Sequence, residues 1–239
     1  MVLVDLDRRV PLGFAPSRKQ EDIRQVHQRW GEPVLSQIVE VSIDLSGSYK
    51  GIVDKLLPNA DVIADRFHLM KIVNQELDTA RKTIVKAQKE NLDKIDKSRI
   101  EAALKQSKYA LLKPEENLTE KQKAQLAEIR EVVPALAQMH HQKEAFRALF
   151  EQAKDWADGT LKLVDWLADA QQTFQKSVGT IGRWFGEVAG DFKNRTTSGA
   201  VEGINNKLKL IKRSGYGFRN FDNFQLRCLI CWHLAITLA

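Results

Sequence analysis

The chain has 239 residues, of which 43% are hydrophobic, so it is long enough and apolar enough to bury a sizeable core and is not expected to be disordered. Its formal net charge of +6 and its pI of about 9.2 favour an anionic partner, of which nucleic acid is the commonest, although many basic proteins bind none. No secretory leader follows Met1, and no segment approaches the ~20 apolar residues that span a bilayer, so we expect a cytoplasmic protein without a membrane anchor.

A hairpin and a helix are predicted at the start of the chain. Residues 2–4 form a short β-type run, and residues 10–15 are expected to return as the second strand, although Pro11 weakens it. Ser17 and Gln20 have the spacing of a capping box, which predicts that a helix begins here.

A strand–helix–strand unit is predicted next. In residues 38–44, valine and isoleucine side chains alternate with polar ones, which is the period of a β-strand. Ser46 is a candidate N-cap for the following helix, and residues 62–64 form a second short strand. Strands joined by a helix at this spacing are expected to pair in parallel.

From residue 69 to about residue 189 the pattern is helical. Thr119 and Gln122 again have the spacing of a capping box. The lysine-rich residues 86–97 are interpreted as solvated helix faces or a hairpin tip, with a binding surface as the alternative. A stripe of apolar residues at helical spacing predicts a buried helix face: Leu126, Ile129, Val133 and Leu136.

Asp44 is the first candidate for chemistry. It ends an apolar strand and precedes a loop into a helix, and ligand sites in α/β sheets gather at the carboxyl ends of strands. A carboxylate at this place is suited to bind a metal ion. An ordinary Asp at a helix N-terminus would look the same, so this feature alone leaves both readings open.

Residues 196–239 are predicted to contain a Thr-Thr-Ser-Gly loop, a basic helix, a glycine turn at residues 215–217 and an apolar helix. In the basic helix, rotation of ~100° per residue places Glu202 opposite an apolar row. Its own row continues with Asn206, Lys209 and Arg213, which also fits a solvated face.

Basic and aromatic residues are interleaved in this last segment. Cations and flat rings are what a DNA-binding surface needs, while the aromatic residues would equally suit a core. The cations are Lys207, Lys209, Lys212, Arg213, Arg219 and Arg227, and the rings are Tyr216, Phe218, Phe221 and Phe224. Cys228 and Cys231 lie in the apolar helix without a second ligand pair, so we interpret them as buried thiols rather than a zinc site.

Five segments resemble one protein family. Residues 41–49 (VSIDLSGSY) resemble its second-aspartate segment, and residues 57–68 (LPNADVIADRFH) resemble its next strand with a D-R-F-H signature. Residues 198–213 resemble its final-glutamate helix, which residues 216–224 (YGFRNFDNF) continue, and residues 108–119 resemble its helical insertion. The chain is similar, along essentially its whole length, to the ISL-three family of bacterial insertion-sequence transposases.

This resemblance implies an α/β fold of mixed α+β type, with an RNase H-like core and a large all-helical insertion. The core would comprise residues 1–68 and 196–239, and the insertion would comprise residues 69–195. A DDE active site is also implied, in which Asp44 is the second acid and Glu202 the final one. Their separation, 202 − 44 = 158 residues, leaves room for the insertion.

The implied activity is metal-dependent cleavage and strand transfer of insertion-sequence DNA, in the bacterial cytoplasm at the nucleoid. Asp44 and Glu202 would hold Mg²⁺ or Mn²⁺, with two ions in the intact site. The partners would be element ends, target DNA and another transposase copy in an oligomer. Supporting residues would be Asp65, Arg66 and His68, and DNA contacts would come from Asn206, Lys207, Lys209, Lys212, Arg213 and Arg219.

The family's first Asp lies on a strand upstream of the segment that matches residues 2–5. We therefore expect the chain to be truncated and inactive as given, since neither Asp5 nor Asp7 is an obvious substitute. In an RNase H-like sheet the first strand is central, so its loss would leave two strand edges unpaired. The alternative function is a non-catalytic remnant that binds element DNA or full-length transposase.

Overall fold

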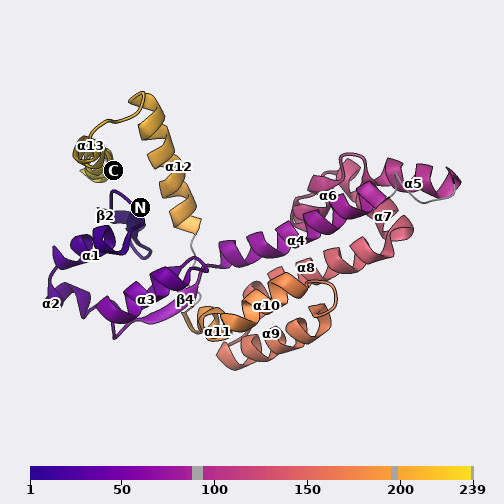
Figure 1. Cartoon of the computed structure of the whole chain (residues 1–239), viewed down its shortest axis with the longest axis horizontal. Helices are drawn as coiled ribbons and strands as arrows, with labels where there is room; N and C mark the ends of the chain where they lie inside the picture. The colour runs from indigo at the N-terminus through magenta and orange to yellow at the C-terminus, as the bar shows by residue number, and fades with distance from the viewer. Residues whose placement is uncertain (88–93, 195–198, 238–239) are drawn as a thin grey trace. The chain divides into compact units, whose positions relative to one another are not determined.

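The computed structural model describes residues 1–87, 94–194 and 199–237 and is a mixed α/β structure that is mostly helical (Figure 1). It divides into two compact units. The first unit comprises Met1–Asp65 and Thr196–Ala239, and the second comprises Arg66–Arg195. Among the described helices, none combines the length and the apolar character that a bilayer crossing needs.

The predicted hairpin is present in the first unit. Strands β1 (Val2–Asp5) and β2 (Val10–Phe14) pair antiparallel, and the register shifts between Leu3 and Val4. Pro11 stands opposite Val4, at this irregularity, where a strand tolerates the missing N–H donor. The Arg8 N–H donates to the Asp5 carboxylate at 2.8 Å, so Asp5 serves the hairpin turn.

The two faces of the hairpin pack against different helices, because successive side chains of a strand point to opposite faces. Val2 and Val4 join a cluster with side chains of α12 (Gly199–Ser214) and α13 (Phe221–Thr237). Leu3 joins a cluster on the other side, with side chains of α1 (Gln20–Gln28) and α3 (Gly47–Leu56). The hairpin thus holds the N-terminal and C-terminal segments together in one unit.

The predicted parallel pair is also confirmed. Strands β3 (Glu40–Ile43) and β4 (Asp61–Ala64) pair in parallel, and α3 connects them in the sequence. A short helix, α2 (Glu32–Leu35), precedes β3. The described strands form two separate two-stranded sheets, β1 with β2 and β3 with β4.

One predicted capping box is wrong and another is confirmed. The N-cap of α1 is Lys19, and Ser17 accepts its N–H at 3.0 Å while donating to the Asp22 carboxylate. Ser17 therefore lies two residues before the N-cap, and its hydroxyl oxygen accepts the Lys19 N–H rather than an N–H of the first helical turn. Thr119 and Gln122 form the predicted reciprocal box at α7 (Glu120–Val132).

Ser46 occupies the N-cap position of α3, as predicted, but its side chain makes no capping hydrogen bond. Its hydroxyl lies 3.0 Å from the Ser48 hydroxyl instead. The predicted Thr-Thr-Ser-Gly loop includes residues of the range 195–198, and the lysine-rich stretch includes residues 88–93. Both of these ranges lie outside the described residues.

The second unit is all-helical in its described part. The stripe predicted from the sequence is buried, and it lies on α7 and the start of α8. The helices are α4 (Arg66–Ala87), α5 (Lys94–Leu104), α6 (Lys108–Leu112), η1 (Glu115–Asn117), α7, α8 (Pro134–Gln152), α9 (Trp156–Ala170), α10 (Gln175–Arg183) and α11 (Phe185–Asn194).

Candidate functional site

Helix α12 separates an apolar face from a polar face, as its spacing predicts. Ile204 and Ile211 are buried, and Leu208 packs against the same cluster. This face is held by the hairpin and by α13, so the opposite face is left to solvent. The side chains exposed there are Glu202, Asn206, Lys209 and Arg213.

Four cations stand exposed around the end of α12 and the turn that follows it: Lys209, Lys212, Arg213 and Arg219. No ion pair described for the chain neutralises any of them. Uncompensated cations on one surface attract phosphate groups. Lys207 differs, because its Nζ atom donates to the Cys231 carbonyl oxygen at 3.2 Å.

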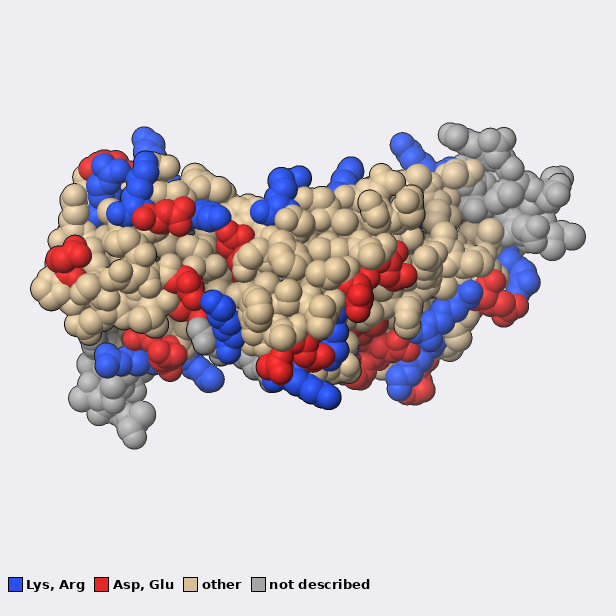
Figure 2. Space-filling model, turned by 90° about the horizontal axis from the view of Figure 1, so that it is seen from below, with Lys and Arg blue, Asp and Glu red and all other residues tan. Residues whose placement is uncertain are grey.

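The second unit shows another charge pattern. Figure 2 shows acidic and basic side chains interspersed over the face of this unit that is in view. Several of its cations are paired with carboxylates, among them Arg99 with Glu131 and Arg130 with Glu115. Mixed and paired charges of this kind are typical of a solvated surface rather than a DNA-binding one.

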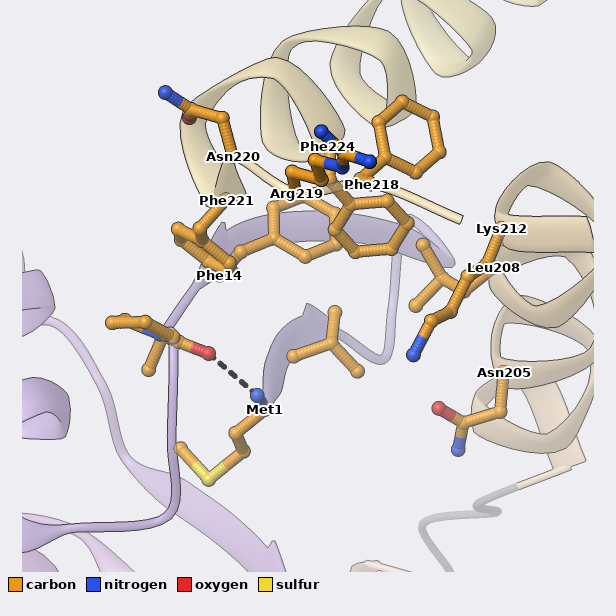
Figure 3. A pocket seen from close by; sticks show the side chains of 13 residues that line it. Met1, Phe14, Asn205, Leu208, Lys212, Phe218, Arg219, Asn220, Phe221 and Phe224 are labelled. Carbon is orange, nitrogen blue, oxygen red and sulfur yellow. Dashed lines mark hydrogen bonds between the residues drawn. The ribbon is translucent and has the colours of Figure 1, made fainter. Parts of the chain in front are cut away.

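A cavity of about 400 Å³ lies beside the cationic end of α12 (Figure 3). Its walls combine rings with polar groups, among them Phe14 of β2, Phe218 and Phe224, together with Lys212 and Arg219. The rings also pack on one another, with the centroids of Phe218 and Phe224 5.3 Å apart. The interpretation of Phe218 and Phe224 as core residues is therefore confirmed. Lys212 and Arg219 line the same cavity and make part of its wall cationic.

Two amides that line this cavity, Asn205 and Asn220, are not among the residues predicted from the sequence. The Asn220 side chain accepts the backbone N–H of Asp222 at 2.7 Å, so it also caps the start of α13. Their position one residue before Asn206 and one after Arg219 is the signal that could have drawn attention to them.

Asp44 directly follows the parallel strand β3, at the place where the sequence predicts a metal ligand. Its Oδ1 atom is buried and has no hydrogen-bond partner in the described protein. A buried carboxylate oxygen without a partner is costly unless something else compensates its charge. This oxygen therefore fits a site that a cation would complete.

Asp65 stands in the matching place on β4. Ile43 pairs with Ala64, so Asp44 and Asp65 follow neighbouring residues of two parallel strands at the same end of the pair. The Asp65 N–H donates to the Ile43 carbonyl oxygen at 2.7 Å, which continues the ladder to this residue. Two acidic residues therefore lie next to each other in register, directly after the carboxyl ends of the two strands.

The D-R-F-H segment lies across the boundary between the units. Asp65 ends the first unit, while Arg66 and His68 open α4 in the second. The Arg66 guanidinium lies 5.7 Å from the ring centroid of Phe150, and the rings of Phe67 and His68 are 5.6 Å apart. The first contact links the start of α4 to α8, whereas the second joins adjacent residues of α4 itself.

Glu202 and Asp44 both belong to the first unit, and Glu202 is exposed on α12. Within the part of the chain that the structure describes, no group of three or more His, Cys, Asp and Glu side chains is arranged to hold a metal ion. The assignments of Asp44 and Glu202 to metal, and of the α12 face to DNA, therefore stay predictions.

The two cysteines agree with the reading as buried thiols. Both are free, Cys228 is buried and Cys231 is half-buried. Burial raises the pKa of the Cys228 thiol to about 11, so it stays protonated and unreactive near neutral pH.

Comparison with known proteins gives one family. A model of the ISL-three DDE group, described as transposase, matches residues 1–228. The transposase for insertion sequence element IS1001 of Bordetella parapertussis is 24% identical over 232 residues, which are 95% of this chain and 55% of that protein. The transposase for element IS1557 of Mycobacterium tuberculosis is 26% identical over 239 residues, covering 92% of this chain and 53% of that protein.

The chain thus spans about half the length of the curated relatives it matches. Another match, 33% identical over 57 residues, is to an ATP-dependent protease of Lactococcus lactis and covers 24% of this chain, too little to carry an assignment. No solved structure matches the chain.

Proposed function

Because the chain belongs to the ISL-three family of transposases, we propose that its first unit binds insertion-sequence DNA and supplies carboxylates for metal-dependent strand cleavage and transfer. The observation that carries the proposal is the buried Oδ1 atom of Asp44, which has no hydrogen-bond partner among the described residues. Asp44 directly follows a parallel strand. Asp44 is the residue that matches the family's second acid.

The proposed metal ligands are Asp44 and Glu202. Carboxylate oxygens are the ligands that Mg²⁺ and Mn²⁺ prefer in proteins. Two such ions, when bound, would polarise the attacked phosphate and stabilise the leaving oxygen. The chain's own part is to hold the carboxylates in place: Asp44 through the β3–β4 ladder, and Glu202 through the apolar face of α12.

The proposed DNA surface is the exposed face of α12 with the turn after it. Lys209, Lys212 and Arg213 would contact phosphates, and Arg219 would extend this surface past the turn. Asn206, next to them, would add a neutral hydrogen bond to the backbone or to a base edge. Lys207 would contribute less to phosphate binding, because its ammonium already contacts α13.

We also propose an RNase H-like arrangement for the first unit. In such a core, the hairpin and the parallel pair would belong to one sheet, whereas the described strands form two. A further strand that paired with both would join them and would carry the third acid. We expect the 239-residue chain by itself to bind element DNA and to cleave it poorly, because only two acids of the proposed site are assigned.

The test is to incubate the purified chain with DNA that carries the element ends, in Mg²⁺ and in Mn²⁺. We expect salt-dependent binding with little nicking. Metal-dependent nicking that Glu202→Gln removes would show that the chain already holds a complete site. Nicking that survives both Glu202→Gln and Asp44→Asn would show that these acids are not the catalytic ones.

A second candidate function is a non-catalytic DNA-binding protein that associates with element DNA or with full-length transposase. The lack of a three-acid cluster among the described side chains favours it over an active enzyme. Binding of element DNA that is identical with and without divalent metal, and unchanged by Asp44→Asn, would select this candidate.

A further inference from the structure

The turn between α12 and α13 presents one side chain fully to solvent. Tyr216 has a relative exposure of 102%, the highest among the exposed large hydrophobic residues of the described chain. Tyrosine has a large apolar ring that normally contributes to a core or an interface. The neighbouring Phe218, Phe221 and Phe224 do pack inward, so the exposure of Tyr216 is particular to its position.

The backbone holds Tyr216 in this position. Its φ of 51° is left-handed, which is unfavourable for a tyrosine and needs support from its surroundings. The Tyr216 N–H donates to the Arg213 carbonyl oxygen at 3.0 Å, and the Gly217 N–H donates to the Lys212 carbonyl oxygen at 3.0 Å. The turn therefore supplies hydrogen-bond donors to carbonyl groups at the end of α12, and these bonds hold the backbone of Tyr216 in place.

Packing behind the turn fixes it further. A Cβ atom on Gly215 would lie 2.7 Å from the ring of Phe218, so this ring rests directly on the glycine backbone. Phe218 in turn packs in the cluster of α12, α13 and the hairpin. The same turn thus packs Phe218 inward and exposes Tyr216 to solvent.

Charge around the turn indicates the partner. Lys212, Arg213 and Arg219 are exposed within four residues of Tyr216, and none takes part in a described ion pair. Tyr109 of the second unit is a useful contrast. It is 58% exposed, and Lys108 and Lys113 lie 5.8 and 5.9 Å from its ring centroid. Its cations face the ring, whereas the ring of Tyr216 is not contacted by any described cation or aromatic group.

We propose that Tyr216 stacks on an unpaired base of DNA, while Lys212, Arg213 and Arg219 hold the phosphates on either side. This inference rests on the proposed DNA function and names the form of DNA that the turn selects. A base in an intact duplex is covered on both faces by its neighbours, so an exposed ring finds a free face at an overhang, gap or frayed end. Stacking of a base on an aromatic side chain is worth roughly 5- to 150-fold in affinity, by alanine substitution.

The test compares two DNAs of equal length, a blunt duplex and a duplex with a short single-stranded overhang, by fluorescence anisotropy with the whole chain. A 2-aminopurine in the overhang reports stacking. Tyr216→Ala should weaken binding of the overhang DNA about tenfold and abolish the quenching of 2-aminopurine, with little change on the blunt duplex. Tyr216→Phe should behave as the unaltered chain, because the ring is kept.

Two further variants separate stacking from folding. Tyr216→Asn removes the ring but suits the left-handed backbone, so it should match Tyr216→Ala in DNA binding while keeping the melting temperature. Tyr109→Ala removes an exposed tyrosine between two lysines of the other unit, and it should change neither DNA affinity.

An equal affinity of Tyr216→Ala and the unaltered chain for the overhang DNA would overturn the proposal and leave the DNA function intact. Equal losses on both DNAs would also overturn it, since Tyr216 would then not read unpaired bases. A change of oligomeric state without a change in DNA affinity would assign Tyr216 to a protein contact instead. An unaltered chain that binds neither DNA would overturn the proposed function as well.

Discussion

The Nζ atom of Lys207 lies 4.2 Å from the ring centroid of Trp232 and donates a hydrogen bond to the carbonyl oxygen of the preceding Cys231. This contact joins α12 to α13 on the side of α12 that turns away from its exposed cations. A lysine in the middle of a basic helix is therefore part of the packing between two helices.

Replacement of Lys207 by Ala should lower the free energy of unfolding by roughly 1–2 kcal/mol, because it removes a cation–π contact and a hydrogen bond from a charged donor. Lys209→Ala, on the exposed face of the same helix, should change it by less than about 0.5 kcal/mol. Urea denaturation of both variants measures the difference. Equal stabilities would show that the contact with Trp232 contributes nothing.

Replacement of Lys209, Lys212 and Arg213 together by Ala should reduce the slope of log affinity against log salt for duplex DNA. Each lost phosphate contact removes about 0.9 from this slope, so the triple variant should lose up to about 2.7. The matched control replaces Lys105, Lys121 and Lys176, three exposed lysines of the second unit, and makes the same change in net charge. If both triple variants reduce the slope equally, the α12 surface has no special role.

His140 predicts a pH dependence of stability. Its imidazole is buried with neither ring nitrogen hydrogen-bonded in the described structure, and burial lowers its pKa from 6.5 to about 4, with Lys143 adding to the shift and Glu144 opposing it. The unfolded chain therefore binds this proton at a higher pH than the folded chain, so stability is complete above the unfolded pKa and falls as the pH decreases through 6.5 toward 4. Between pH 7 and pH 5 the loss should be roughly 1–2 kcal/mol.

This loss of stability at acidic pH should be absent in the variant His140→Gln, because glutamine is not protonated in this pH range. Glu144 does not obscure the test, because its pKa is lowered below 4.5 and its contribution disappears only at more acidic pH. Thermal melting of both proteins at pH 7 and pH 5 measures the effect. A parallel decrease in the two proteins would assign the acid sensitivity to other groups.

Two glycines of the second unit should respond in opposite directions to alanine. A Cβ atom on Gly159 of α9 would lie 2.4 Å from the ring of Phe192 in α11, so Gly159→Ala should destabilise the chain by roughly 1–3 kcal/mol through overpacking. At Gly179 of α10 the nearest such atom is the end of the Arg183 side chain at 3.9 Å, so Gly179→Ala should stabilise it by about 0.5–1 kcal/mol. Stabilisation by both changes would mean that α9 and α11 do not approach so closely.

Much of the local structure could be predicted from the sequence, because it depends on periodic patterns. The alternation in residues 38–44 predicts the strand that forms as β3, although Val39 is exposed and only Ile43 of the strand is buried. The apolar row of α12 predicts the face that this helix buries. The pairing of β3 with β4 follows from the helix between them.

Other features depend on partners that the local sequence does not reveal. Lys143 is 1% exposed because its ammonium reaches the carbonyl oxygens of Leu111 and Lys113, both at 2.9 Å, about thirty residues earlier in the chain. Ser17 lies before the N-cap of α1, where its hydroxyl bonds to Lys19 and Asp22 instead of capping the helix. Tyr216 resembles the phenylalanines that follow it in the sequence, but the left-handed turn gives it a different exposure.

Asp65 provides a test of how the acids divide their roles. In a polypeptide that cleaves element DNA, Asp44→Asn and Glu202→Gln should abolish cleavage and leave DNA affinity nearly unchanged, since each removes a ligand charge and keeps the shape. Asp65→Asn should reduce the rate of cleavage by less, if Asp65 only supports the site. A fatal Asp65→Asn beside a harmless Asp44→Asn would reverse the assignment of the second acid.

The most direct test of the central claim is the affinity of the chain for Mn²⁺ in the presence of element-end DNA, measured by calorimetry or by the spin resonance of free Mn²⁺. The account predicts that Asp44→Asn weakens this binding on the order of tenfold, because the ion loses a charged oxygen ligand. Asp222→Asn, which removes an exposed acid at the start of α13 in the same unit, should leave it unchanged. Equal Mn²⁺ affinity of Asp44→Asn and the unaltered chain would contradict the assignment of Asp44 as a metal ligand.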